Sequence, residues 1–198
     1  MKKNLIIITI DGARLDRVKN SKIYNQTNSI FFSQCITYGP HTIAAMHAIF
    51  SGSYGSRTGT NSYRSTYKCK KQEFHTLTEY LSEENYFTHA DIHSEIVIPK
   101  QGFDIFNVYD ENENLTLRHS KLLEKFSSEF KSKNFFLYLH YDKIHSGITE
   151  SVLKKFDNFS SEYFKNQENN KKNYDKLFYE SELYLEQIFN QLESLNLL

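Results

Sequence analysis

The sequence has no excess of charge of either sign and contains only two cysteines. Lysine plus arginine and aspartate plus glutamate both number 24, so no overall field attracts nucleic acid or an anionic membrane. Cys35 and Cys69 could pair, but they show neither a CxxC motif nor a zinc-ligand spacing. A reduced intracellular protein is the simpler interpretation, and we expect no nucleic-acid partner.

The sequence also lacks a long hydrophobic run. The first apolar segment, Leu5 to Ile10, is six residues long, ends at Asp11 and has no small-residue cleavage site, so it does not fit a signal peptide. No other segment approaches the roughly 18 apolar residues that a membrane-spanning helix needs. We therefore expect a cytoplasmic protein without a membrane span.

The material for a folded core is abundant. Among 198 residues, 39% are hydrophobic, and 16 phenylalanines and 14 tyrosines are present, which is enough for one α/β domain. Continuous apolar or β-branched runs predict buried strands at 5–10 and 135–141, and the segment 86–93, which follows a predicted helix, is predicted to form another strand. Periodic apolar positions predict helices that begin at the capping box of Thr76 and Glu79 and over 115–131 and 174–195.

Strands and helices therefore alternate along the chain. This order predicts an α/β fold with a largely parallel sheet and flanking helices. The segment 164–175 is rich in Asn and Lys and fits either a solvated loop or the start of a helix. Because residues 197–198 follow a helix without a returning strand, we expect a domain that is incomplete at its C-terminus.

The first predicted strand runs directly into Asp11 and Gly12. A carboxylate at the tip of a buried strand costs several kcal/mol of desolvation unless a cation or hydrogen bonds compensate for it. A metal ligand and an Asx turn are equally good interpretations of Asp11. Asp16 and Arg17 are predicted to form a surface pair rather than to bind a ligand.

Thr42 stands at or just before the first turn of a small-residue segment that favours a helix and ends at Gly52. One interpretation is that its side chain caps this helix. The other is that the helix N-terminus lowers the pKa of the Thr42 hydroxyl and binds a tetrahedral anion. The position of Thr42 in the sequence, taken alone, favours the capping interpretation over the anion-binding one.

Five segments, taken in order, resemble the sulfatase branch of the alkaline phosphatase superfamily. They are the strand and aspartate at 8–16, the threonine-headed helix at 42–52, the strand at 86–90, the Gly-Phe-Asp-x-Phe stretch within 99–106, and the strand with two histidines at 135–145. The resemblance covers nearly the whole chain, which would then be the N-terminal portion, residues 1–198, of a single sulfatase-like domain.

This resemblance implies a metal-dependent hydrolase of sulfate or phosphate esters. It implies that Asp11 and Thr42 bind a divalent metal (Ca, Mg, Mn or Zn), that Thr42 is the nucleophile and that His140 is catalytic. It also implies that His93 and His145 bind the substrate, a small-molecule or glycan ester. From the residues alone, His140 and His145 fit a role in the substrate pocket and a structural position in the core equally well. His47 fits pocket lining or surface.

The departures from the family pattern restrict the function. Formylglycine sulfatases carry Cys-x-Pro-Ser-Arg where this chain has Thr-Ile-Ala-Ala-Met, so no oxidation to an aldehyde is expected. An unmodified threonine resembles the phosphoethanolamine and phosphoglycerol transferases, which gives a transferase as one alternative. The Asp-His-Gly strand that completes the family's metal site would begin past Leu198. The chain alone is therefore expected to be nearly inactive, and a non-catalytic interaction domain is the second alternative.

Overall fold

The computed structural model describes residues 3–24, 29–62, 69–130, 133–148 and 164–197. The chain divides into two compact units. The first comprises Met1–Ile8, Phe32–Asp110 and Ser128–Leu139, and the second comprises Thr9–Phe31, Glu111–Ser127 and His140–Leu198.

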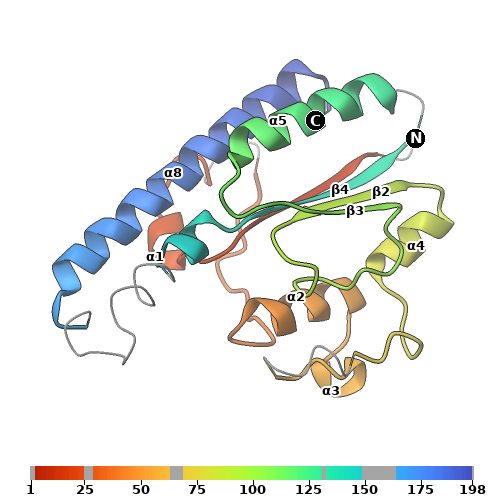
Figure 1. Cartoon of the computed structure of the whole chain (residues 1–198), viewed down its shortest axis with the longest axis horizontal. Helices are drawn as coiled ribbons and strands as arrows, with labels where there is room; N and C mark the ends of the chain where they lie inside the picture. The colour runs from red at the N-terminus through yellow and green to blue at the C-terminus, as the bar shows by residue number, and fades with distance from the viewer. Residues whose placement is uncertain (1–2, 25–28, 63–68, 131–132, 149–163, 198) are drawn as a thin grey trace. The chain divides into compact units, whose positions relative to one another are not determined.

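A four-stranded sheet has the order β1-β4-β2-β3 (Figure 1). Its strands are β1 (Leu5–Ile10), β2 (Phe87–Ile92), β3 (Ile105–Val108) and β4 (Phe135–Tyr141). Strand β2 pairs in parallel with β4 and with β3. All seven residues of β4 are buried, as expected for a continuous apolar run in a parallel sheet. The fold is thus α/β with a parallel sheet and flanking helices, as the sequence predicted.

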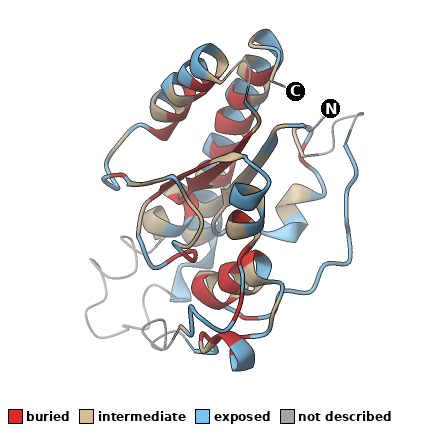
Figure 2. Cartoon of the chain, turned by 90° about the vertical axis from the view of Figure 1, so that its right-hand side faces the viewer, coloured by how far each residue is buried: buried red, intermediate tan, exposed pale blue. Residues whose placement is uncertain are grey.

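The first unit contains the helices α2 (Thr42–Ser51), α3 (Gly55–Thr58) and α4 (Leu77–Glu83). Its core joins Met46 and Phe50 of α2 to apolar residues of the strands, and Figure 2 shows these buried positions in red. The predicted capping box is present before α4, where the Thr76 side chain accepts a hydrogen bond from the Glu79 backbone N–H and the Glu79 carboxylate accepts one from the Thr76 backbone N–H.

The second unit contains α1 (Leu15–Val18), most of α5 (Leu115–Glu129) and the long α8 (Gln167–Ser194). Helices α5 and α8 lie side by side (Figure 1), and the Gln191 side-chain amide donates to the Ser120 carbonyl at 2.9 Å. The start of α8 falls inside 164–175, so the helix-start interpretation of that segment is confirmed. Among the described residues, no helix is long and apolar enough to cross a bilayer.

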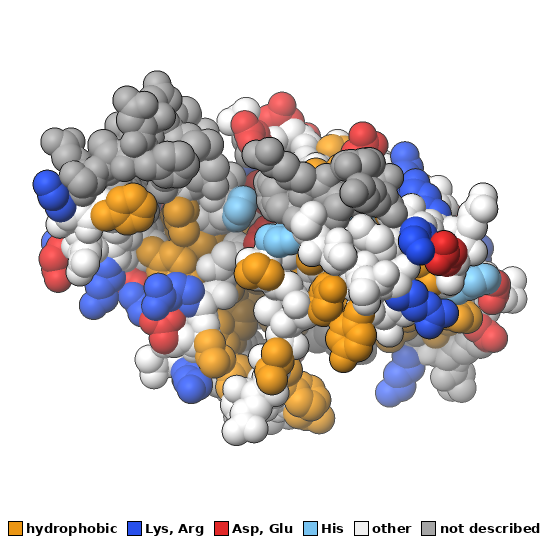
Figure 3. Space-filling view, turned by 90° about the horizontal axis from the view of Figure 1, so that it is seen from below, with side chains coloured by type: hydrophobic (Ala, Val, Ile, Leu, Met, Phe, Trp, Pro, Cys, Tyr) orange, Lys and Arg blue, Asp and Glu red, His pale blue; other side chains and the backbone are white. Residues whose placement is uncertain are grey.

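The described surface carries apolar side chains among charges of both signs, as the face in Figure 3 shows. In the first unit, Phe32, Ile36 and Tyr54 are the most exposed of the large apolar residues, at 72%, 98% and 71%.

Candidate functional site

Asp11 and His140 meet in the second unit. The backbone N–H of Asp11 donates to the Tyr141 carbonyl at 2.9 Å, which holds the end of β1 beside the end of β4. The Asp11 carboxylate oxygen Oδ2 lies 3.5 Å from Nε2 of His140. The His140 side chain is fully buried, whereas 14% of the Asp11 side chain is exposed. Two residues that the sequence singled out separately thus face each other.

Parallel strands explain this meeting, because their carboxyl ends lie at one edge of the sheet. Gly12 follows Asp11 with a φ of 89°, and a Cβ there would lie 3.0 Å from Cγ2 of Ile144. The turn after β1 therefore approaches the segment after β4 closely. That close approach explains why a glycine follows the aspartate.

His145 belongs to the same segment after β4 and is exposed. Asp142, which lies between the two histidines in the sequence, is only 1% exposed. The backbone N–H of Ser146 donates to the Asp142 carbonyl at 2.9 Å, so a helical turn separates the two side chains along the chain. The structure thus gives a solvent-accessible His145 and a buried Asp142.

Thr42 lies in the first unit as the first residue of α2, and it is half-buried. The residue that caps the helix is His41, whose Nδ1 accepts a hydrogen bond from the Ala44 backbone N–H at 3.3 Å. The interpretation of Thr42 as the capping residue is therefore wrong, because the extended backbone of His41 places an imidazole where the cap is needed. Gly52, with a φ of 59°, ends α2 as predicted.

His93 also belongs to the first unit, where it follows β2. It is half-buried, and its ring centroid lies 6.5 Å from that of Tyr109. Asp11, His140 and His145 belong to the second unit. The structure therefore brings Asp11 and His140 together within one unit, while a substrate-binding role for His93 stays a prediction.

His47 is buried at 5% exposure, so the expectation of a surface position is wrong. Its Nε2 lies 3.4 Å from the Ile96 carbonyl oxygen, and its Nδ1 lies 3.9 Å from Sγ of Cys69. Burial, the largest cause, lowers the pKa of His47, and it outweighs the opposing effect of the contact with the Ile96 carbonyl. His47 is therefore held in its neutral form inside the first unit.

Asp16 forms the predicted surface ion pair, although with two arginines. Its carboxylate accepts hydrogen bonds from Arg14 at 2.9 Å and from Arg17 at 2.5 Å. The hydrogen bond with Arg14, the largest cause, lowers the pKa of Asp16. The Asp16 carboxylate thus pairs with cationic side chains of its own short segment, apart from the Asp11–His140 pair.

Two buried polar pairs were missed by the sequence reasoning. His89 on β2 lies 3.2 Å from Nδ2 of Asn107 on β3, and Nδ1 of His119 on α5 lies 2.7 Å from the hydroxyl of Tyr184 on α8. The two residues of each pair lie on different elements of the chain. The only sequence signal for these pairs is the presence of polar residues inside otherwise apolar strands and helices.

The Asp11–His140 pair supplies two of the donors that a divalent metal needs. Asp11 and His140 offer a carboxylate and an imidazole, both common ligands, whereas such sites take about four ligands or more. Within the part of the chain that the structure describes, no three His, Cys, Asp or Glu side chains gather in a way that could hold a metal ion. The pair fits part of a metal site.

A model of the sulfatase family matches residues 3–198 of the sequence. The chain belongs to the sulfatase family. No curated protein matches this sulfatase-family chain in sequence.

Solved structures share its alkaline phosphatase-like fold. Murine ectonucleotide pyrophosphatase/phosphodiesterase 5 matches 98% of this chain with a TM-score of 0.68 and 12% identity, and an inactive threonine-to-alanine variant of it in complex with AMP matches 99% with a TM-score of 0.62 and 11% identity. BT4656 in complex with its substrate D-glucosamine-2-N,6-O-disulfate matches 80% with a TM-score of 0.55 and 16% identity. The sulfatase-family chain spans 54% of the length of the murine protein and 38% of BT4656.

Proposed function

We propose that this protein hydrolyses sulfate or phosphate esters with Thr42 as the nucleophile. The observation that carries the proposal is the position of Thr42 at the head of α2, where His41 already performs the capping role. A hydroxyl at this place lies in the positive field of the helix N-terminus, where it can meet a tetrahedral anion.

The proposed reaction has two steps. The Thr42 hydroxyl loses its proton to water as its oxygen attacks the sulfur or phosphorus atom, the bond to the ester oxygen breaks, and that oxygen takes up a proton to leave as the alcohol. Water then attacks the resulting Thr42 ester, which releases sulfate or phosphate and restores the hydroxyl. The N-terminus of α2 stabilises the non-bridging oxygens in both steps.

The resemblance to the family assigns Asp11 and Thr42 to a divalent metal ion, and we keep that assignment as part of the proposal. A bound cation would lower the pKa of the Thr42 hydroxyl and would neutralise the negative charge of the substrate. The chain's own contribution is Asp11, a half-buried carboxylate beside an imidazole.

The two histidines receive different roles. His140 is fully buried and faces Asp11, so we propose that it positions the Asp11 carboxylate rather than exchanging protons with the substrate. His145 is exposed and follows the same strand, which suits a group that contacts substrate or protonates the leaving oxygen. His93 is kept as a proposed substrate contact.

The substrate proposal rests on the relatives. One is a phosphodiesterase whose threonine-to-alanine variant is inactive and was captured with AMP, and another was captured with a disulfated sugar as its substrate. We propose an ester of a sugar or nucleotide for this protein, without choosing between sulfate and phosphate.

A transferase that passes the group from Thr42 to an alcohol follows the same first step. A cytoplasmic location also stays a proposal.

The test uses this chain and the longest natural product of its reading frame, assayed on an aryl sulfate and an aryl phosphate with added divalent metal. We expect turnover by the longest product, which Thr42→Ala abolishes while the circular dichroism spectrum is unchanged, and little turnover by the 198-residue chain. Ser56→Ala removes an exposed hydroxyl in the same unit and serves as the matched control. Equal turnover by Thr42→Ala and the parent would overturn the proposal. Absence of turnover with every metal would instead favour the interaction-domain alternative.

A further inference from the structure

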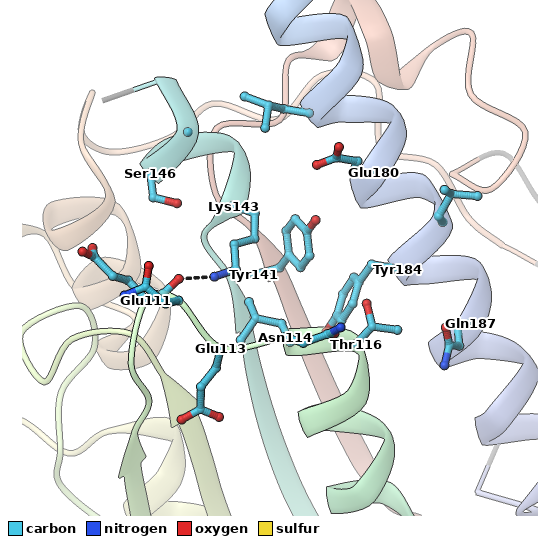
Figure 4. A pocket seen from close by; sticks show the side chains of 15 residues that line it. Glu111, Glu113, Asn114, Thr116, Tyr141, Lys143, Ser146, Glu180, Tyr184 and Gln187 are labelled. Carbon is cyan, nitrogen blue, oxygen red and sulfur yellow. Dashed lines mark hydrogen bonds between the residues drawn. The ribbon is translucent and has the colours of Figure 1, made fainter. Parts of the chain in front are cut away.

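A pocket of about 640 Å³ lies in the second unit, where the end of β4 meets α8 (Figure 4). Three segments line it, 111–116, 141–147 and 177–187. Because successive side chains of a strand point to opposite faces, Tyr141 faces this pocket while its neighbour His140 faces Asp11. The pocket thus belongs to a different face of β4 from the Asp11–His140 pair.

Tyr141 is the distinctive residue of this pocket. It is only 5% exposed, and no hydrogen bond reaches its hydroxyl from the residues that the structure describes. Its ring packs against that of Tyr184, with 4.4 Å between centroids. The Tyr184 hydroxyl is satisfied by His119, at 2.7 Å, so the two stacked tyrosines differ in this respect. The Tyr141 hydroxyl opens into the pocket, where a group of a ligand can replace water as its hydrogen-bond partner.

The charged side chains around Tyr141 are mostly acidic. Glu111, Glu113 and Glu180 line the pocket, and Lys143 is the one basic side chain that does so. The Lys143 ammonium donates to the Glu111 carbonyl, as the dashed line in Figure 4 shows, and Glu113 is paired with Arg118 at 2.7 Å.

Glu180 is the pocket glutamate whose charge acts on the Tyr141 hydroxyl. Its contact with Lys176 is a long, exposed pair at 3.9 Å, which contributes little. Burial first, and then the negative charges of Glu180 and Asp142, raise the pKa of Tyr141, so its hydroxyl keeps its proton at neutral pH. The local charge therefore disfavours an anionic ligand.

The remaining lining supplies apolar surface. Leu115, Leu177 and Leu183 reach the pocket from α5 and α8. We propose that this pocket binds a small organic cation with an apolar body, whose protonated amine donates hydrogen bonds to the Tyr141 hydroxyl oxygen and the Glu180 carboxylate. This inference does not depend on the proposed esterase chemistry, since none of its residues takes part in that chemistry.

Calorimetric titration of the 198-residue chain tests the pocket with three probes of similar size: phenethylammonium, 2-phenylethanol and 3-phenylpropanoate. We expect the ammonium to bind at least about tenfold more tightly than the alcohol or the carboxylate, because only it satisfies both oxygens. Equal binding of ammonium and alcohol, or no binding of the ammonium at millimolar concentration, overturns the proposal.

Variants then locate the site. Tyr141→Phe should weaken ammonium binding about tenfold without lowering the thermal unfolding temperature, because the deleted hydroxyl has no partner in the described structure. Glu180→Gln should weaken it similarly. Tyr179→Phe and Glu186→Gln change exposed residues of the same helix that do not line the pocket, and they should bind as the parent does. Unchanged ammonium affinity in Tyr141→Phe would exclude this pocket.

Discussion

The Asp11 carboxylate lies 3.5 Å from the buried imidazole of His140, although the two residues belong to strands that are far apart in the sequence. Neither strand creates this relationship alone. It follows from the sheet order, in which β1 and β4 are neighbours, and from the backbone hydrogen bond between Asp11 and Tyr141. A carboxylate fixed in this way can act as one ligand of a cation.

Asp11→Asn should weaken binding of a divalent metal by about tenfold or more, because an amide lacks the negative charge that attracts the ion. Calorimetric titration with manganese and with zinc measures the effect. Asp16→Asn is the control, since the Asp16 carboxylate is exposed and bound to Arg14 and Arg17. Equal affinities of Asp11→Asn and the parent would remove Asp11 from the metal site.

His41→Ala should lower the free energy of unfolding by about 1 kcal/mol, because it removes the hydrogen bond that caps α2. Thr42→Ala should lower it by less than about 0.5 kcal/mol, since alanine is a good helix former and the cap remains. Urea denaturation of both variants measures the difference. The reverse order would show that Thr42, and not His41, stabilises the start of the helix.

Gly102→Ala and Gly52→Ala compare two glycines with positive φ. At Gly102, with a φ of 76°, a Cβ would lie 2.3 Å from the Glu79 backbone nitrogen, so the substitution should cost more than about 3 kcal/mol. At Gly52, with a φ of 59°, nothing lies within 4 Å, and only the backbone strain of about 1 kcal/mol is expected. Thermal and urea unfolding give both values. Similar losses at the two positions would contradict the close approach at Gly102.

The buried His47 should make the stability depend on pH. Its pKa is lowered in the folded state, chiefly by burial, so the unfolded chain takes up a proton first as the pH falls through about 6.5. The stabilising effect is complete above that pH and is lost below it. His47→Gln should therefore flatten the change in unfolding free energy between pH 5 and 7, measured in urea. His75→Gln, at an exposed histidine, should not; equal slopes in all three proteins would be the contrary result.

Much of the fold could be predicted from local patterns. The strands at 5–10 and 135–141 are largely apolar runs, and α4 begins at a capping box, so short-range physics defines these elements. Strand β3 and helices α1 and α3 were missed because each has only four residues, too few to show a period.

The candidate site could be predicted only in part. The sequence placed Asp11 and His140 each near the end of a strand, but their contact depends on which strands are neighbours, which no local pattern contains. The cap of α2 was misassigned because threonine is a common capping residue, whereas His41 caps through a side chain that is rarely used in this way. The open hydroxyl of Tyr141 could not be foreseen, because it depends on packing against α8.

The central claim is that Thr42 carries the transferred group. The most direct test is a rapid acid quench of the longest natural product of this reading frame during turnover of an aryl phosphate or aryl sulfate, followed by peptide mass spectrometry. The account predicts a phosphoryl or sulfuryl group on the peptide that contains Thr42, and no such group in Thr42→Ala. Turnover with that peptide unmodified, or with the group on another residue, would contradict it.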